Sequence, residues 1–319
     1  MARLPYPSDL TNSQWKLVAP IIPPVKPGGR PRKYDMREVV NGILYVNHEG
    51  CRWRALPHDL PHGKTCYNFF RGFETDGTWD KLVTALRVTV REKLGRNPTP
   101  SGGCIDSQSA KTAGGGAEVG VDGGKMVRGR KRHIVTDTLG LLLVVLVTAA
   151  NCDDGETAPK VLTELHADEF PRLSVVWADK KYRNNNLDAW LAGQTRLRVE
   201  VTSKPEGQKG FKPLAKRWVV EQTFGCLVRS RRLVRDYERL AETSAAMVKV
   251  SCIHRMARRA RPPRGKRKFR YKRKAAARPF WNRLLLFTPR TKSRNVSQTI
   301  RAASGPTLLI SPYWAFFDP

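Results

Sequence analysis

Two aspartates and one glutamate, far apart in the chain, have the residue types and settings for binding a divalent cation. Asp106 follows a short apolar stretch in the segment CIDSQSAK, and Asp179 follows the apolar run VVWA. Glu221, in the segment KRWVVEQTFG, is the only acid in residues 207–235, a stretch that holds eight lysines and arginines. Side chains at strand ends project from a rigid platform into a crevice, where α/β sheets build their sites.

If the helix that carries Glu221 packs beside the two strand ends, the three carboxylates converge. Like charges a few ångströms apart raise one another's pKa, and burial raises it further, so a cation is needed between them. Mg²⁺ prefers oxygen ligands, and two such ions activate a water or a 3′-hydroxyl in phosphodiester transfer. We therefore expect Asp106, Asp179 and Glu221 to be catalytic groups that bind two Mg²⁺ (or Mn²⁺) ions per site.

Each of these carboxylates also has an ordinary structural interpretation. Asp106 and Asp179 both precede polar segments, where aspartate commonly caps a turn. Glu221 lies four residues after Arg217, the spacing of an ion pair on one face of a helix. Spacing alone leaves both interpretations open.

The charge of the chain indicates a polyanionic partner. It has 319 residues, with 58 lysines and arginines against 28 acids, and a formal net charge of +30. Such an excess repels itself in the folded state unless a polyanion offsets it, so nucleic acid is the expected partner, with a solvated basic surface as the alternative. The side chains expected to contact DNA phosphates are Lys131, Arg132, Lys216, Arg229, Arg231 and Arg232. His133, beside two of them, is interpreted as structural.

The elements around the carboxylates predict an α/β domain over residues 104–260. The segment KRHIVTDTLGLLLVVLVTAA reads as two β-rich runs joined by a turn near Gly140, which is a hairpin signal. Helical and strand-like segments then alternate as far as the helix of Glu221, where Val220, Phe224 and Leu227 form an apolar stripe that would press on the sheet. A last helix ends near residue 260.

Residues 1–95 predict a small all-α domain of helix-turn-helix type, because capped amphipathic segments follow one another with basic and aromatic residues between them. A helical module that does not touch DNA is the alternative. Trp53, Trp79 and Trp218 are interpreted as core residues. Residues 96–103 read as a linker. Residues 261–319 hold 15 lysines and arginines against one acid and are expected to form a basic, disordered tail.

The remaining composition limits the compartment. Six scattered cysteines without a CxxC pair argue against zinc and disulfides and indicate a reducing environment. The longest apolar run, LGLLLVVLVTAA, is about half a membrane span. We expect a cytoplasmic, nucleoid-associated protein with neither a membrane partner nor a small-molecule substrate.

The chain resembles bacterial insertion-sequence transposases of the DDE type over nearly all of residues 5–260. In the first part, GRPRKYDMREVVNGILYV and DGTWDKL are similar to the family's helical DNA-binding region. In the second part, CIDSQSAK, VVWADKKY and RWVVEQTFGCLVRSRRLVRDYE are similar to the blocks around its two aspartates and its glutamate. The resemblance implies a ribonuclease H-like catalytic domain in which Asp106, Asp179 and Glu221 are the metal ligands and Arg217 lies near DNA phosphate.

The resemblance further implies a transposase that binds the terminal inverted repeats of double-stranded DNA, cleaves the ends and transfers them to a target, as a homodimer in the synaptic complex. Two positions depart from the family pattern: Leu214 replaces a tyrosine and Lys181 replaces a glycine. If that glycine has a positive φ, lysine there is strained by about 1 kcal/mol. The alternatives are a catalytically impaired relative that occupies element ends, and a nuclease without strand transfer.

Overall fold

A computed structural model describes residues 3–25, 27–28, 31–193, 196–202 and 217–263. The N-terminal part is helical, with α1 (Asn12–Val18), α2 (Met36–Glu49), α3 (Gly63–Thr75) and α4 (Thr78–Lys93), and with 3₁₀ turns η1 (Ala19–Ile21) and η2 (Trp53–Ala55). Thr11 and Gln14 form a capping box before α1, and Asp35 caps α2. Gly50 ends α2 at a φ of 76°, a conformation that glycine adopts without strain. The predicted all-helical start is confirmed.

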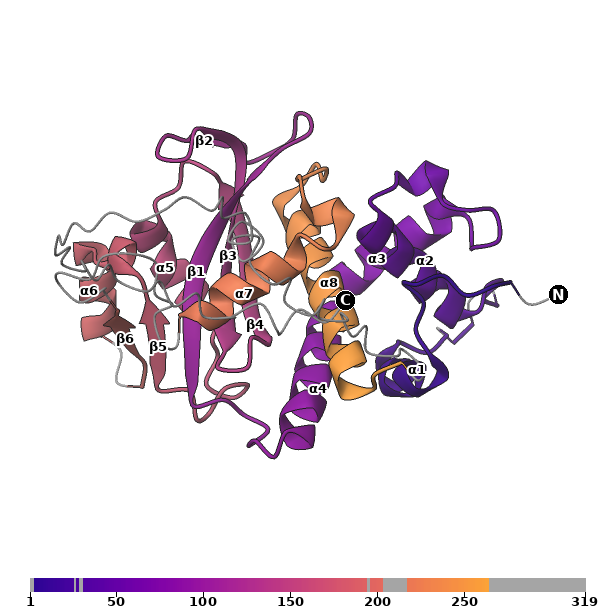
Figure 1. The fold of residues 1–319 in the computed structure, drawn as a ribbon, viewed down its shortest axis with the longest axis horizontal. Helices are drawn as coiled ribbons and strands as arrows, with labels where there is room; N and C mark the ends of the chain where they lie inside the picture. The colour runs from indigo at the N-terminus through magenta and orange to yellow at the C-terminus, as the bar shows by residue number, and fades with distance from the viewer. Residues whose placement is uncertain (1–2, 26, 29–30, 194–195, 203–216, 264–319) are drawn as a thin grey trace, which may run out of the picture. The chain divides into compact units, whose positions relative to one another are not determined.

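A mixed sheet follows these helices (Figure 1). Its strands are β1 (Gly102–Lys111), β2 (Gly120–Asp122), β3 (Val127–Asp137), β4 (Leu142–Ala149), β5 (Val175–Ala178) and β6 (Arg198–Val201). The order is β2-β3-β1-β5-β6, and β4 also pairs with β3. β3 pairs antiparallel with both β1 and β4, whereas β5 runs parallel to β1 and β6 parallel to β5. The predicted hairpin is confirmed as β3–β4, which turns at Gly140 with a φ of 72°.

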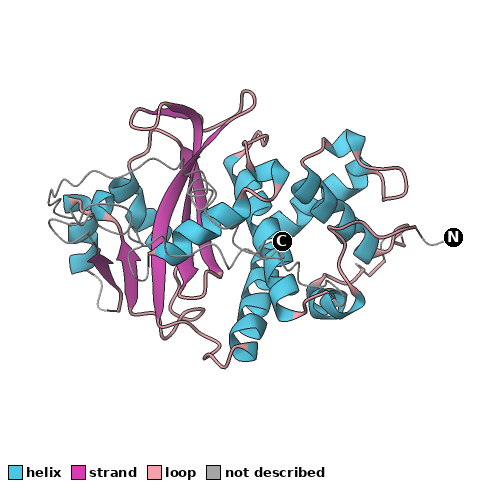
Figure 2. Cartoon of the chain, in the orientation of Figure 1, coloured by secondary structure: helices cyan, strands magenta, loops and turns pink. Residues whose placement is uncertain are grey.

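Alternating residues of the central strands enter two separate cores, as the two-residue period of a strand requires. Cys104 and Trp177 belong to one hydrophobic cluster, and their neighbours Ile105 and Val176 to the other. The first cluster includes α7 (Trp218–Leu227) and α8 (Ala241–Ala260), and the second includes α5 (Asp154–Thr163) and α6 (Asn185–Ala192). Figure 2 shows this sheet with helices on both sides. The predicted α/β fold is confirmed.

The helical start and the sheet share their packing. Residues 1–263 form one compact unit. α8 contacts α1, α2, α3 and α4 as well as β4, and the first hydrophobic cluster runs from Leu10 to Ala260 (Figure 1). The predicted boundaries at 95 and 104 thus fall inside this unit, and a division into two domains stays a prediction. The predicted basic tail, apart from residues 261–263, lies outside the described residues.

No helix in the described ranges is long and apolar enough to cross a membrane.

Candidate active site

Strand register places the two aspartates close together. Cys104 of β1 is the partner of Trp177 in the parallel pairing with β5. Asp106 and Asp179 each lie two residues further along, just beyond the end of this pairing, and the charge of Asp179 acts on the Asp106 carboxyl. Asp179 directly follows β5 and has an extended backbone.

The sequence predicted Asp106 at the end of a strand, but it lies within β1. β1 continues to Lys111, because its antiparallel pairing with β3 outlasts its parallel pairing with β5, which stops at Cys104. Asp106 therefore lies in mid-strand, directly beyond the carboxyl edge of the parallel part. The crevice expected at strand ends is thus formed where β5 stops beside a longer β1.

The two aspartates lie on the side of the sheet that carries the helix of Glu221. In an extended strand, Asp106 shares its face with Cys104, and Cys104 packs in the cluster that contains Val220 and Phe224 of α7. α7 contacts both β1 and β3. The predicted apolar stripe is confirmed, since Val220, Phe224 and Leu227 are all buried.

Arg217 links Asp179 to Glu221. Its Nη2 lies 3.7 Å from Oδ2 of Asp179 and 3.6 Å from Oε1 of Glu221, and the arginine side chain is only 14% exposed. The second contact is the i, i+4 pair that the sequence allowed. The first contact was not foreseen, because it joins a helix to a strand 38 residues earlier in the chain.

Asp106 belongs to the same electrostatic cluster. Burial raises the pKa of its carboxyl to about 6, and the charges of Asp179 and Glu221 raise it as well. The backbone N–H of Ser107, which donates to Oδ1 of Asp106 at 2.8 Å, and the Arg217 guanidinium lower that pKa. The chain therefore gathers three acids around one arginine and leaves Asp106 poorly neutralised.

The donor chemistry of this cluster fits a hard divalent cation, because all three acids offer carboxylate oxygens. Within the described residues, however, no three acidic, histidine or cysteine side chains stand close enough to bind a metal ion as they are placed. Arg217 supplies the positive charge between two of the acids. Binding of an ion by all three thus requires the guanidinium and the carboxylates to shift.

Lys181 is unstrained. Its backbone lies in the 3₁₀ turn η3 (Lys180–Tyr182), and the described non-glycine residues with positive φ are Glu118 and Met126. The N–H of Lys181 donates to Oδ1 of Asp179 at 2.8 Å, which fixes that carboxylate. The condition for a cost of lysine at this position, a positive φ, is therefore not met, because the turn is right-handed.

Tyr182 was missed by the sequence analysis. Its side chain is 1% exposed, and its hydroxyl has no hydrogen-bond partner among the described residues. Burial raises the pKa of this phenol, and the charges of Asp106, Asp154 and Asp179 raise it further. The sequence feature that could have identified Tyr182 is its position three residues after Asp179.

Lys131 and Arg132 are buried inside the fold. Lys131 is buried, donates to the carbonyl of Cys152 at 2.6 Å and lies 3.2 Å from Asp154. Arg132 is 1% exposed and donates to the carbonyl of Leu233. Both side chains are thus engaged in contacts inside the fold, so the structure does not support the predicted contacts of Lys131 and Arg132 with DNA phosphates.

His133 is also interior, as its structural interpretation expected. Nε2 lies 3.0 Å from Oγ1 of Thr148, and burial lowers the pKa of the imidazole to about 4.

The other predicted DNA contacts divide by exposure. Arg229 and Arg231 are exposed, and Arg231 lies 3.7 Å from Glu49 of α2. Arg232 is buried, where it pairs with Glu238 at 2.8 Å and donates to the carbonyl of Cys51. Lys216 and Leu214 lie outside the described residues.

Comparison with known proteins places this arrangement in a family. Residues 97–256, half of the chain, match the family described as "Transposase DDE domain", and residues 10–83 match "Putative transposase of IS4/5 family". The chain belongs to the DDE transposase family. The sheet is accordingly the ribonuclease H-like sheet of that domain, and the resemblance seen in the sequence is confirmed.

Two relatives of this transposase come from Burkholderia cepacia. One is the "Insertion element IS402 uncharacterized 16.2 kDa protein", 32% identical over 112 residues, which cover 33% of this chain and 75% of the relative. The other is the "Putative transposase for insertion sequence element IS402", 32% identical over 130 residues, which cover 39% of this chain and 61% of the relative. The chain thus matches about three fifths of the second relative's length.

Proposed function

We propose that this transposase binds the terminal inverted repeats of an insertion sequence, cleaves DNA at those ends and joins the freed ends to a target. The observation that carries the proposal is the meeting of Asp106, Asp179 and Glu221 around Arg217 in a DDE transposase domain. The net charge of +30 supports a DNA partner, because a polyanion offsets it.

Asp106, Asp179 and Glu221 would bind two Mg²⁺ or Mn²⁺ ions, which supply activation of the nucleophile and stabilisation of the leaving oxygen when bound. A water attacks the phosphorus at the element end, and the bond from phosphorus to the 3′-oxygen breaks. This releases a 3′-hydroxyl and a 5′-phosphate. The 3′-hydroxyl then attacks a target phosphodiester in line and displaces the 3′-oxygen there, without a covalent enzyme intermediate.

Arg217 has two roles in this proposal. In the free protein its guanidinium neutralises Asp179 and Glu221. With cations bound by the carboxylates, the guanidinium would be free to contact a DNA phosphate, for which its planar fork is well suited. The exposed Arg229 and Arg231 extend the same basic segment.

Residues 1–95 would read the element ends, and residues 104–260 would cut them. The family match of residues 10–83 to a putative IS4/5 transposase supports a role for the helical part in the same activity. Both ends must be held together for joining, so we propose a homodimer in the synaptic complex.

A strand-cleavage assay tests the proposal. A labelled duplex carrying the DNA that borders the gene is incubated with the full chain and Mg²⁺. We expect cleaved and joined products from the parent protein, and Asp106→Asn, Asp179→Asn and Glu221→Gln should each lower cleavage by at least about a hundredfold while DNA binding is kept. Asp168→Asn, which changes an exposed carboxylate, is the matched control and should cleave normally.

The other outcomes separate the alternatives. Binding without any cleavage by the parent protein identifies a catalytically impaired relative that occupies ends. Cleavage without joined product identifies a nuclease. Cleavage that survives all three substitutions contradicts the assignment of the acids.

A further inference from the structure

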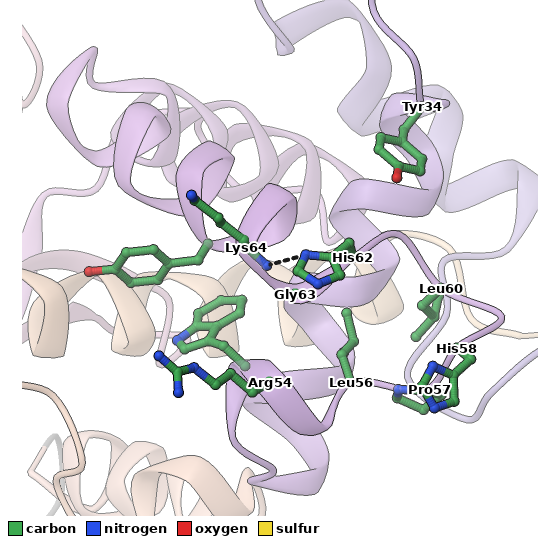
Figure 3. A pocket seen from close by; sticks show the side chains of 11 residues that line it. Tyr34, Arg54, Leu56, Pro57, His58, Leu60, His62, Gly63 and Lys64 are labelled. Atoms are coloured by element: carbon green, nitrogen blue, oxygen red, sulfur yellow. Dashed lines mark hydrogen bonds between the residues drawn. The ribbon is translucent and has the colours of Figure 1, made fainter.

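A pocket in the helical part is used by none of the steps above. It has a volume of about 930 Å³ and lies where η2 and the following loop meet the start of α3 (Figure 3). Its lining is Tyr34, Trp53, Arg54, Leu56, Pro57, His58, Leu60, His62, Gly63, Lys64 and Tyr67. A volume in this range is typical of sites for organic ligands.

Two aromatic side chains of the pocket lining, Trp53 and Tyr67, are connected to a buried aromatic cluster. Trp79, 1% exposed, contacts Phe70 at 6.2 Å between ring centroids, and Phe70, fully buried, contacts Trp53 at 5.4 Å. Trp53 contacts Tyr67 edge-to-face at 5.5 Å, and Tyr67 is 38% exposed. These contacts thus connect the core to an accessible ring. Trp53 itself is half-buried and packs against the core, as interpreted, whereas Trp218 is 43% exposed and is not a core residue.

Gly63 allows the close approach of Trp53 to α3. A Cβ atom there would come within 1.8 Å of the carbonyl oxygen of Trp53, so only glycine lets α3 approach η2 this closely. The turn before α3 is fixed as well, because Nδ1 of His62 accepts the N–H of Lys64 at 3.2 Å (Figure 3). The pocket is therefore preformed.

The polar groups of the pocket are suited to an anionic ligand. Among the residues that the structure describes, its lining contains no acid, while Arg54 and Lys64 are both exposed. Asp59, the acid in this loop, accepts a hydrogen bond from the Tyr6 hydroxyl at 2.9 Å and is not part of the lining. Trp53 Nε1 is covered and donates to no acceptor among the described residues.

We propose that this pocket binds an unpaired DNA nucleobase, which stacks on the ring of Tyr67 beside Trp53 while its flanking phosphates contact Arg54 and Lys64. Aromatic rings beside cations are the usual means of binding single-stranded nucleic acid, since every base has a face for stacking. A paired base exposes only its edges in the grooves of DNA, whereas an aromatic ring stacks on the face of a base. Rings within a pocket therefore favour a base that has left the double helix. The inference rests on the proposed function for its DNA partner.

Binding of three duplexes to the full chain tests this assignment. The first is fully paired, the second carries one unpaired thymidine, and the third carries an abasic site at the same position. Fluorescence anisotropy gives the Kd of each. The ratio of the abasic to the thymidine Kd isolates the base, since both duplexes are equally interrupted. We expect a ratio of at least about five for the parent protein, as stacking on an aromatic side chain provides.

Tyr67→Ala should bring that ratio to about one, and Tyr67→Phe should keep it, because the ring remains. Tyr237→Ala, on a tyrosine that is 45% exposed and outside the pocket, is the matched control and should keep the ratio. A thermal unfolding curve for each variant verifies that it is folded.

A ratio near one for the parent protein, or one that Tyr67→Ala leaves unchanged, overturns the inference. If Tyr67→Ala weakens all three duplexes equally, the pocket contacts DNA backbone and the nucleobase assignment is wrong. In these cases cleavage in the strand-cleavage assay shows that the proposed function stands. Binding to no duplex, together with no cleavage, overturns both.

Discussion

Arg217 and Asp106 show how the site is balanced at the scale of single residues. Arg217 lies within 3.7 Å of both Asp179 and Glu221, so these two acids have a partner in the free protein. Among the described residues, Asp106 has a backbone N–H and the more distant charge of Arg217 as its partners, and burial raises its pKa to about 6. Its negative charge is therefore a cost to folding that a bound cation would offset.

We predict that Asp106→Asn stabilises the metal-free protein near neutral pH. The ordinary pKa of this acid is 3.8 and the folded value is about 6, so the folded chain binds more protons between these values and loses stability as pH rises through them. The variant should gain about 1–3 kcal/mol at pH about 8, and the gain should shrink toward zero near pH about 4. Thermal unfolding in a chelator at both pH values measures it.

The control for this prediction is Asp168→Asn, which removes a carboxylate that is exposed. It should change stability little at either pH. A neutral or destabilising effect of Asp106→Asn at high pH would contradict the burial argument.

The residue scale also shows where sequence reasoning stops. Asp106, Asp179 and Glu221 could be selected because acids stand out beside apolar strands and in a basic segment. The burial of Lys131, Arg132 and Arg232 could not be predicted. The groups that Lys131 contacts lie more than 20 residues away in the sequence, and the carbonyl group that Arg132 contacts lies about 100 residues away in the sequence.

Local signals predicted most elements well. The capping box at Thr11, the cap at Asp35 and the glycine stops gave the helices their ends, because these residues satisfy backbone groups within a few positions. The length of β1 was underestimated, since half of it is polar and is held as a strand by β3. Strand pairing over a long separation overrides local pattern.

At this scale, two glycines of α3 give opposite predictions. Gly63→Ala should destabilise the protein by about 1–3 kcal/mol, because the new Cβ meets the backbone of Trp53. Gly72→Ala should stabilise it by about 0.5–1 kcal/mol, since no atom of the described residues lies within 4 Å of a Cβ there and alanine favours the helix. Denaturant unfolding of both variants compares them, and equal effects would contradict the described approach of α3 to η2.

At the scale of the whole molecule, the fold connects distant parts of the chain. The cluster that packs α7 and α8 on the sheet also contains the cores of α2, α3 and α4, so the position of Glu221 depends on the same packing as the nucleobase pocket. The sequence predicted the α/β class and the helical start, because composition and periodicity change between them. The core that the helical start and the sheet share could not be predicted, because the hydrophobic pattern within one segment does not show which other segment packs against it.

The central claim is that acids at positions 106, 179 and 221 meet to bind divalent cations. A crystal structure of the full chain with Mn²⁺, read by anomalous scattering, tests it most directly. The account predicts a peak with oxygens of Asp106, Asp179 and Glu221 as ligands and with the Arg217 guanidinium moved away from the acids. No peak between these acids, with Arg217 still joining Asp179 to Glu221, would contradict it.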